Sequence, residues 1–326
     1  MLPKLRDNGF IICLLLMVPL AWLLPEAGRT GGWLRAEYLI KAGVFVIFLM
    51  QGLSLPTEQL ARGALNWRLH AFVQTWNFLW APFLGLLLVT LSAPLLDSSL
   101  RTGFLYLAVL PTTVVTAMLF TGSARGDVPG ALFNTALSNG LAVFLVPAWC
   151  LILFAAAGGL PPVGPMLTQL SILILLPMLL GQAIRPFSGR FLSILRVWFK
   201  PLSNGIICFA VFAAFANSFH EAVWERTGWA AAGTAFAGVV LFLALVSILV
   251  GRTARLVMTD AEARTAAFFC ASQKSIATGV PMAAVIFADG MAAELSLILL
   301  PLLFYHPLQL ILGSFLVDRW NRRSHP

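Results

Sequence analysis

The chain is dominated by long apolar stretches that are separated by short polar turns. Ten such stretches follow one another, and most are close to the ~20 residues that a helix needs to cross a bilayer. They cover residues 10–24, 38–55, 69–91, 100–121, 129–156, 166–185, 201–219, 229–251, 264–288 and 291–317. The turns between them contain helix-ending residues such as Pro25, Gly28 and Pro94. The pattern predicts an all-α membrane protein with ten transmembrane helices.

The composition agrees with a lipid environment. Of the 326 residues, 60% are hydrophobic and only 10% are charged, whereas a soluble domain carries roughly 25% charged residues. The net charge of +8 is typical of cytoplasmic loops that face anionic lipid, so we do not expect nucleic acid as a partner. The four cysteines lie inside predicted spans without CxxC spacing, and neither a disulfide nor a metal site is expected.

The first stretch follows two basic residues, Lys4 and Arg6, and has the outline of a signal peptide. No small-x-small cleavage site follows it, and nine more apolar stretches do. We therefore expect it to be retained as the first span.

The distribution of Lys and Arg between alternate turns predicts the orientation. One side collects 15 of the 21 basic residues, the other side collects 5, and Lys274 alone lies deep within a span, far from either end. The side with 5 holds Arg29, Arg35, Lys41, Arg101 and Arg226. Because cytoplasmic loops are enriched in Lys and Arg, we expect both termini in the cytoplasm of a protein in the cell (inner) membrane.

Five spans in each half allow two inverted repeats, 1–160 and 161–326. Arg101-Thr102 opens the fourth stretch and Arg264-Thr265 opens the ninth, 163 residues later, which is half of 326. At the same offset Pro111 aligns with Lys274. The two stretches are therefore expected to be interrupted at the same depth, as in the paired broken helices of many secondary transporters.

The ninth stretch carries the only charge that lies deep inside an apolar segment. We expect a helix to enter at Arg264, to lose regular hydrogen bonding around Gln273, Lys274 and Ser275, and to resume after Pro281. Broken helices at membrane depth are tolerated only where they are buried in protein or line a water-filled cavity. This predicts a transporter in which spans 4 and 9 cross at their breaks.

Polar residues near the breaks are the candidates for substrate or ion binding. Amide and ionisable groups at membrane depth are costly and indicate function, whereas a single Ser or Thr more often bonds to its own helix or joins neighbouring helices. The candidates are Lys274, Gln273, Ser272, Ser275, Thr278, Thr112, Thr113, Thr116, Asn134, Thr135, Ser138, Asn139 and Asn77, with Pro111 and Pro281 as helix breaks.

Enzymatic motifs are missing. His220-Glu221 begins like HExxH, but Trp224 stands at the position of the second zinc ligand. No GxSxG, Walker A or suitably placed GxGxxG occurs. We therefore expect no enzyme activity, no metal site and no cofactor.

Four segments together resemble the bile acid:sodium symporter superfamily. They are FLMQGLSLP (48–56), LPTTVVTAMLFTGSARGD (110–127), FNTALSNGLAVFLVP (133–147) and FFCASQKSIATGVPMA (268–283). More closely they are similar to its divergent SBF-like branch. This branch includes bacterial symporter-like proteins, the seventh member of the vertebrate solute-carrier family ten and yeast regulators of calcium homeostasis.

The resemblance implies two inverted five-helix repeats, with a panel domain of spans 1, 2, 6 and 7 and a core domain of spans 3, 4, 5, 8, 9 and 10. In the sodium-dependent branch the ninth span carries a glutamate four residues before a glutamine, which asparagine follows. Phe269, Gln273 and Lys274 stand at these positions. Gln273 carries over as a ligand, as do Asn77 and Thr135, but the sodium-binding glutamate is missing. Sodium coupling and a bile-acid substrate are therefore not assumed.

These observations predict a symporter-like secondary transporter of a small organic anion that works by alternating access. The alternative is a membrane regulator of calcium or glycosylation homeostasis without transport of its own, as the eukaryotic relatives suggest. Solute flux in reconstituted liposomes distinguishes the two.

Lys274 is expected to replace a sodium ion. The half-helix that ends near Gln273 should direct its unpaired carbonyls at the ammonium. The lysine either stays charged and neutralises an anionic substrate, or loses its proton during the cycle and couples transport to protons. The alternative is that its side chain extends to the cytoplasm, but about ten residues, or ~15 Å of helix, separate it from Arg264.

Overall fold

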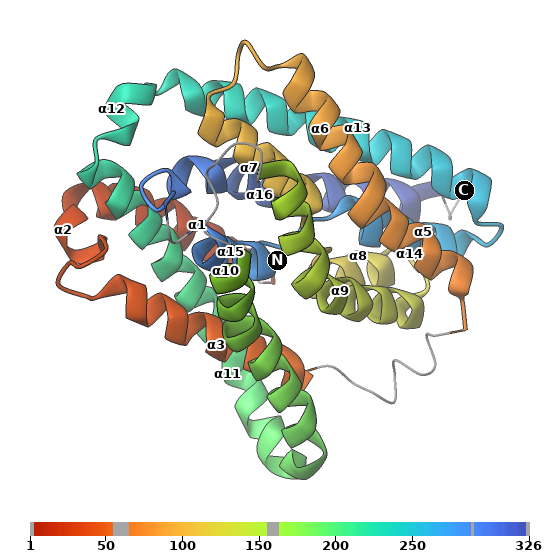
Figure 1. Cartoon of the computed structure of the whole chain (residues 1–326). Coiled ribbons are helices and arrows are strands. Elements are labelled where there is room, and N and C mark those ends of the chain that lie inside the picture. Colours follow the sequence, from red (N-terminus) through yellow and green to blue (C-terminus); the bar gives the residue numbers. More distant parts are fainter. Residues whose placement is uncertain (1–2, 55–64, 155–162, 288–289, 324–326) are drawn as a thin grey trace. The chain divides into compact units, whose positions relative to one another are not determined.

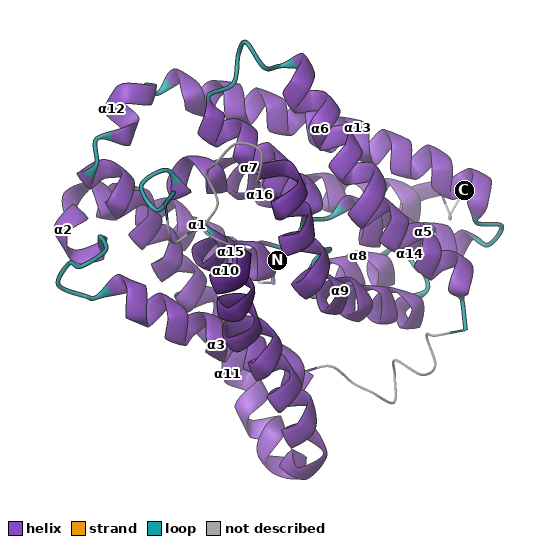
Figure 2. Cartoon of the chain, in the orientation of Figure 1, coloured by secondary structure: helices purple, strands orange, loops and turns teal. Residues whose placement is uncertain are grey.

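The computed structural model describes residues 3–54, 65–154, 163–287 and 290–323, and these segments contain helices and loops but no strand (Figure 2). Within these described residues, seven helical segments are long and apolar enough to span a membrane. They are Ala36–Ser54, Trp67–Leu91, Val128–Leu153, Thr168–Gly189, Ile194–His220, Ala230–Val257 and Leu295–Arg322. The all-helical membrane architecture expected from the sequence is confirmed at this level.

The other three expected spans correspond to shorter helices. The first lies in α1 (Pro3–Leu23), whose apolar part is Gly9–Leu23. The fourth is divided between α7 (Ser98–Val109) and α8 (Val115–Ser123), and the ninth between α14 (Ala261–Ser272) and α15 (Ile276–Ile286). A total of ten spans and their inverted repetition remain predictions, and the expected boundary at residues 160 and 161 lies outside the described residues.

The chain forms two compact units whose segments alternate along the sequence. Figure 1 labels the helices of both units and colours them by their position in the sequence. Unit 1 comprises Met1–Leu55, Leu151–Trp229 and Val280–Leu299, and unit 2 comprises Pro56–Cys150, Ala230–Gly279 and Leu300–Pro326. Each unit therefore takes segments from both halves of the chain.

Unit 1 is built around α3 (Ala36–Ser54) and α11 (Leu176–His220). These helices approach closely at Gly52 and Gly181, where an added Cβ would lie 2.2 Å from the Met178 carbonyl oxygen and 2.4 Å from the Leu49 carbonyl oxygen. Small residues allow such backbone contact between membrane helices. The unit also contains α2 (Pro25–Gly28), α10 (Val163–Leu170), the π-helix η3 (Ser171–Leu175) and α12 (Val223–Thr227).

The sixth and seventh expected spans meet at a kink within α11. α11 runs through both, and its path changes at Gly189, where φ is 39° and ψ is −125°. A positive φ is open to glycine because it has no Cβ. The turn expected between these two spans is thus made at a single glycine.

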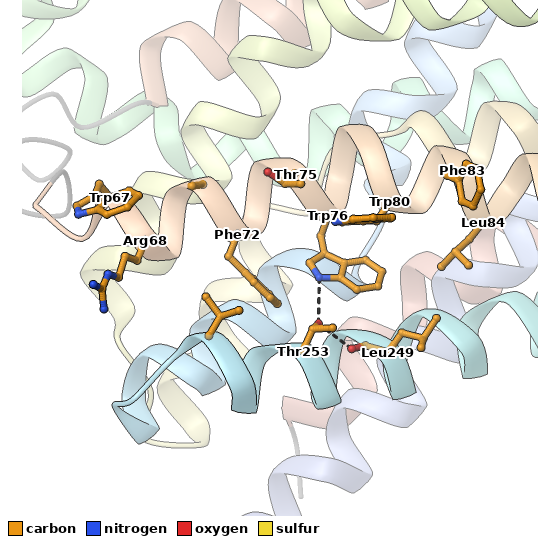
Figure 3. A pocket seen from close by; sticks show the side chains of 12 residues that line it. Trp67, Arg68, Phe72, Thr75, Trp76, Trp80, Phe83, Leu84, Leu249 and Thr253 are labelled. Carbon is orange, nitrogen blue, oxygen red and sulfur yellow. Dashed lines mark hydrogen bonds between the residues drawn. The ribbon is translucent and has the colours of Figure 1, made fainter.

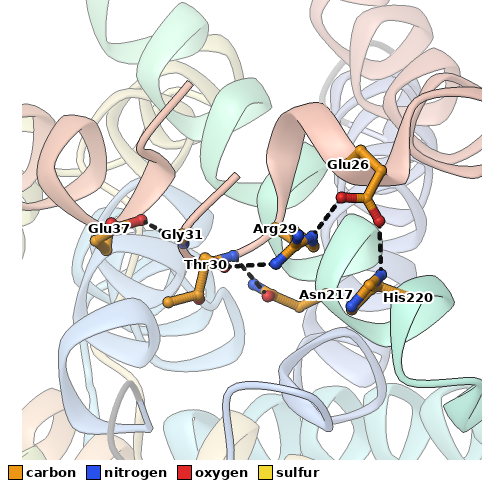
Figure 4. Close-up of polar contacts among 7 residues, drawn as sticks. All are labelled: Glu26, Arg29, Thr30, Gly31, Glu37, Asn217 and His220. Atoms are coloured by element: carbon orange, nitrogen blue, oxygen red, sulfur yellow. Dashed lines mark hydrogen bonds and ion pairs between the residues drawn. The ribbon is translucent and has the colours of Figure 1, made fainter. Parts of the chain in front are cut away.

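A polar cluster fastens the α2 segment to the end of α11 within unit 1 (Figure 4). The Glu26 carboxylate contacts Arg29 Nε at 2.7 Å and His220 Nδ1 at 3.0 Å. Asn217 Oδ1 accepts a hydrogen bond from the Thr30 backbone N–H at 2.9 Å. The hydrogen bond from Arg29 lowers the pKa of the Glu26 carboxyl. The cluster therefore keeps its carboxylate ionised to lower pH than a free glutamate.

Unit 2 holds both interruptions, together with α7, α8, α14 and the start of α15. Its other elements are α5 (Trp67–Thr75), the π-helix η1 (Trp76–Trp80), α6 (Ala81–Leu91), α13 (Ala230–Val257), most of α9 (Val128–Phe154) and most of α16 (Leu295–Arg323). The interruptions span residues 110–114 and 273–275. Both lie where the sequence predicts them.

The prediction that the ninth helix resumes after Pro281 is wrong. α15 starts at Ile276, and Pro281 lies inside it. The Ser275 side chain caps the new helix, because its Oγ accepts the Thr278 N–H at 3.2 Å and its carbonyl accepts the Gly279 N–H at 2.9 Å. The serine cap thus starts the helix before Pro281. Proline is tolerated inside membrane helices.

Candidate functional site

The centre of the candidate site is Lys274, which is completely buried between α14 and α15. Its Nζ donates hydrogen bonds of 2.8 Å to the carbonyl oxygens of Ala108 and of Leu110, at the end of α7. Carbonyls in the last turn of a helix have no partner within the helix and form the negative end of its dipole. The ammonium therefore lies where such a helix end favours a cation.

The local sequence explains why these carbonyls are free to accept. Pro111 has no N–H, so it cannot continue the α7 hydrogen-bond ladder. The Thr112 N–H instead donates a hydrogen bond to Ser138 Oγ, with an N–O distance of 3.4 Å. The oxygen of Ala108 thereby loses its helical donor and bonds to Lys274. Pro111 thus contributes to the cation site by ending α7.

The expectation that the half-helix ending near Gln273 supplies carbonyls to Lys274 is wrong. The carbonyls at the end of α14 have other partners: Tyr305 Oη donates to the Ser272 oxygen at 2.7 Å, and Asn77 Nδ2 donates to the Cys270 oxygen at 3.2 Å. The carbonyls that hold the ammonium belong to the other interrupted helix. Each break therefore bonds to the other.

A direct backbone bond also joins the two breaks. The Ser275 N–H donates to the Pro111 carbonyl oxygen at 2.9 Å. Beside it, Thr278 Oγ1 donates to Asn139 Oδ1 at 2.6 Å, and Asn139 Nδ2 donates to the Thr112 oxygen at 3.0 Å. One amide of α9 thus bridges both interrupted helices.

Whereas Lys274 bonds to the end of α7, Gln273 bonds to residues at and beside the start of α8. Its backbone is extended, with φ of −95° and ψ of 148°, and successive side chains of extended backbone point to opposite sides. Its Oε1 accepts from Thr113 Oγ1 at 2.7 Å and from Thr116 Oγ1 at 2.8 Å. Its buried Nε2 has no partner among the described residues. Gln273 and Lys274 therefore connect α14 to α8 and to α7, respectively.

A small cavity of about 10 Å³ in unit 2 is lined partly by Gln273, Ser272, Ser247 and Gln309. This is about the space of one water molecule. Gln273 Nε2 and Ser247 Oγ are both buried without a partner in the described part of the chain, so the cavity has the polar lining that a bound water needs.

Other candidates are placed further from this centre or face their own helices. Asn77 Nδ2 contacts Ser138 Oγ at 3.3 Å, whereas Asn134 bonds to His70 Nδ1 at 2.9 Å and to Gln74 Nε2 at 3.2 Å. The hydroxyls of Ser272 and Thr135 bond to carbonyls of their own helices, those of Phe268 and Leu132. The Ser272 and Thr135 hydroxyls therefore bond within their own helices and make no bond across the breaks in the described part of the chain.

Gln309 is a site residue that the sequence analysis missed. Its Oε1 accepts the Lys274 N–H at 2.7 Å, its Nε2 donates to the Lys274 carbonyl oxygen at 2.9 Å, and its Nε2 lies 3.0 Å from His306 Nδ1. A buried amide in an apolar span, three residues after a histidine, was the signal that could have found it.

The position of the missing glutamate is filled by aromatic packing. The ring of Phe269 lies 5.5 Å from the rings of Phe120 and Trp320 and 5.3 Å from that of Phe268, between centroids. This side chain offers no ligand for a metal ion. The Phe269 side chain beside the break is thus packed among aromatic rings.

Two helices that are interrupted at the same polar centre, within a helical membrane protein, are typical of secondary transporters. Comparison with known proteins agrees: a profile of the SBF-like CPA transporter family matches residues 8–322. The chain belongs to this family, and relatives of the chain include proteins that are named as a symporter and as a cotransporter.

Relatives cover nearly the whole chain. The "Uncharacterized protein PA2026" of Pseudomonas aeruginosa is 31% identical over 98% of this chain and 95% of its own length. The "Putative symporter YfeH" of Escherichia coli is 31% identical over 97% of this chain and 94% of its own length, and the "Sodium/bile acid cotransporter 7" of Danio rerio has the same values. The names of the second and third relatives support the resemblance to the bile acid:sodium symporters.

Proposed function

We propose that the chain is a secondary transporter of a small organic anion that works by alternating access and does not use sodium. The observation that carries the proposal is the Lys274 ammonium, completely buried and held by the Ala108 and Leu110 carbonyls. A lysine at this point supplies the positive charge that a bound cation would otherwise supply at a helix end. Phe269, which has no polar atom in its side chain, supports the same proposal.

The Lys274 ammonium can bind an anion because it has three N–H donors. The Ala108 and Leu110 oxygens accept two hydrogen bonds from Nζ. A carboxylate, sulfonate or phosphate oxygen is the partner expected for the third donor. Either the charge persists through the cycle, or the proton leaves with each turnover and couples transport to protons.

Alternating access is supported by the construction of the site. The segments of the proposed panel spans 1, 2, 6 and 7 fall within unit 1, and both breaks fall within unit 2. The 10 Å³ cavity beside Gln273 is too small for an organic substrate. A substrate at Lys274 therefore requires movement that opens the break.

Flux measurements test the proposal directly. A thermal-shift screen of carboxylates, sulfonates and phosphate esters identifies a stabilising anion, because a ligand that binds the folded state raises the unfolding midpoint. Uptake of this anion into proteoliposomes is expected to be unchanged when potassium replaces sodium on both sides. A matched pair of vesicles with and without a proton gradient then distinguishes proton coupling from a fixed charge.

An absolute requirement for sodium would contradict the substitution of the ion by Lys274. Absence of flux for every stabilising anion, together with a calcium phenotype on deletion of the gene, would favour a regulator without transport of its own.

The orientation is a further prediction, which rests on the excess of basic residues on one side. Reporter fusions at Gly189 and after Pro326 are expected to be cytoplasmic, and a fusion at Gly159, outside the described residues, is expected on the opposite side. Gly189 is suitable because the turn there has no side chain to displace. An external C-terminus would contradict the arrangement of two inverted five-helix repeats.

A further inference from the structure

An apolar groove of about 740 Å³ runs between the α5–η1–α6 segment and α13 within unit 2 (Figure 3). Its lining includes Trp67, Phe72, Trp76, Trp80 and Phe83 on one side, and Leu249, Thr253 and Val257 on the other. Both walls are candidate membrane spans. The groove therefore lies along segments that face lipid.

Two polar groups in the middle of the groove wall, on Trp76 and Thr253, are already paired. Trp76 Nε1 donates to Thr253 Oγ1 at 3.1 Å, and Thr253 Oγ1 donates to the Leu249 carbonyl oxygen at 2.7 Å. The wall thus presents mainly hydrocarbon and aromatic surface. Such a wall fits an acyl chain better than a polar solute.

The single charged residue of the lining stands at one end. Figure 3 shows Arg68 beside Trp67, with Phe83 and Leu84 at the opposite end. The guanidinium lies 5.8 Å from the Trp67 ring centroid, and within the described residues no carboxylate pairs with it. Trp and Arg at the end of a span mark the level of the lipid headgroups.

The length of the groove also matches a lipid. Trp67 and Leu84 are 17 residues apart in a nearly continuous helical segment, which corresponds to ~25 Å. The hydrocarbon core of a bilayer is ~30 Å thick. An acyl chain that lies along this wall can therefore keep its headgroup beside Arg68.

We propose that this groove binds one anionic phospholipid, with an acyl chain along Trp76, Trp80 and Phe83 and its phosphate-bearing headgroup on Arg68. Charge complementarity selects this occupant, because the cytoplasmic leaflet is rich in anionic lipid and the charge of Arg68 lies at the end that the basic-residue distribution assigns to the cytoplasm. The lipid fixes α13 to the α5–η1–α6 segment. The site is independent of Lys274 and of the transported substrate.

Native mass spectrometry of the purified chain tests the proposal with two lipids of identical acyl chains, phosphatidylglycerol and phosphatidylcholine. The wild-type protein is expected to retain one phosphatidylglycerol and to bind it about fivefold more tightly than phosphatidylcholine. Arg68→Gln is expected to remove this preference. Arg255→Gln changes an exposed charge on α13 that does not line the groove, and it is expected to keep the preference.

A second pair of variants tests the acyl-chain position. Ala71 lines the groove and is exposed, so Ala71→Trp fills it and is expected to abolish the binding of both lipids. Leu79→Trp places the same ring at an exposed position of η1 outside the lining and is expected to leave binding intact. An unchanged elution volume and unfolding midpoint verify that each variant is folded.

Equal binding of the two lipids by the wild-type protein would overturn the proposal, as would equal losses in Arg68→Gln and Arg255→Gln. A lipid-free dimer that only Ala71→Trp dissociates would show that a second copy of the chain occupies the groove. Since Arg68 is exposed, Arg68→Gln remains decisive even if Ala71→Trp does not fold.

Discussion

Replacement of Lys274 by alanine is expected to abolish anion flux in proteoliposomes while the protein still folds and inserts. The variant loses two charge-assisted hydrogen bonds, each worth about 1.5–3 kcal/mol, between Nζ and the Ala108 and Leu110 oxygens. It also removes a buried ammonium whose insertion costs ~3 kcal/mol. The two bonds together amount to about 3–6 kcal/mol, so the two effects oppose each other and leave a net destabilisation of at most ~3 kcal/mol. The folded state is therefore expected to persist, whereas the positive charge that attracts the substrate is lost.

The measurement compares initial uptake rates with thermal unfolding midpoints in the same preparation. Lys41→Ala is the matched control, because it removes an exposed lysine of α3. Lys274→Arg keeps the charge but changes its shape, so partial flux is expected from it. A fully active Lys274→Ala protein would exclude this residue from the transport mechanism.

The positions of the breaks could be predicted from the sequence because they depend on local chemistry. Pro111 ends a helix by lacking an N–H, and a charged residue within an apolar stretch indicates a place where regular helix is interrupted. The start of α15 was misjudged because Ser275 and Pro281 both mark helix starts. In the structure the helix starts after Ser275, because the Ser275 hydroxyl accepts a hydrogen bond from the Thr278 N–H.

The partners within the site could not be predicted, because they depend on which helices meet. Nothing in the local sequence distinguishes α7 from α14 as the source of carbonyls for Lys274. The choice follows from Tyr305 and Asn77, which bond to the α14 carbonyls from other spans. Gln309 was missed for the same reason, since its role depends on lying against a residue 35 positions away.

Hydroxyl groups show a second limit on what can be predicted from the sequence. Thr113 and Thr135 both lie in apolar spans close to a predicted break, and spacing does not separate them. In the structure Thr113 bonds to Gln273, whereas Thr135 bonds to the Leu132 carbonyl of its own helix. A short polar side chain can bond to its own backbone or to a neighbouring helix, and only the packing of the spans decides between them.

Replacement of Gln309 by leucine is expected to destabilise the protein by about 2–5 kcal/mol and to reduce flux strongly. The leucine leaves both the N–H and the carbonyl of Lys274 without the partners that Gln309 provides. A buried backbone group that loses its hydrogen bond costs ~1–3 kcal/mol. The break then loses the side chain that fixes the direction of Lys274 toward α7, so both the unfolding midpoint and the initial rate should fall.

Gln182→Leu provides the comparison for Gln309→Leu, because Gln182 Nε2 makes a single 2.6 Å hydrogen bond to the Gly52 carbonyl in unit 1. It removes the same amide from a membrane span and is expected to cost only ~1 kcal/mol with flux retained. Lys274→Ala keeps its backbone groups bonded to Gln309, so its midpoint should stay above that of Gln309→Leu. If Gln309→Leu and Gln182→Leu shift the midpoint equally, Gln309 does not hold the break. If Gln309→Leu unfolds at a lower temperature but transports normally, the geometry of the break is not what positions the ammonium.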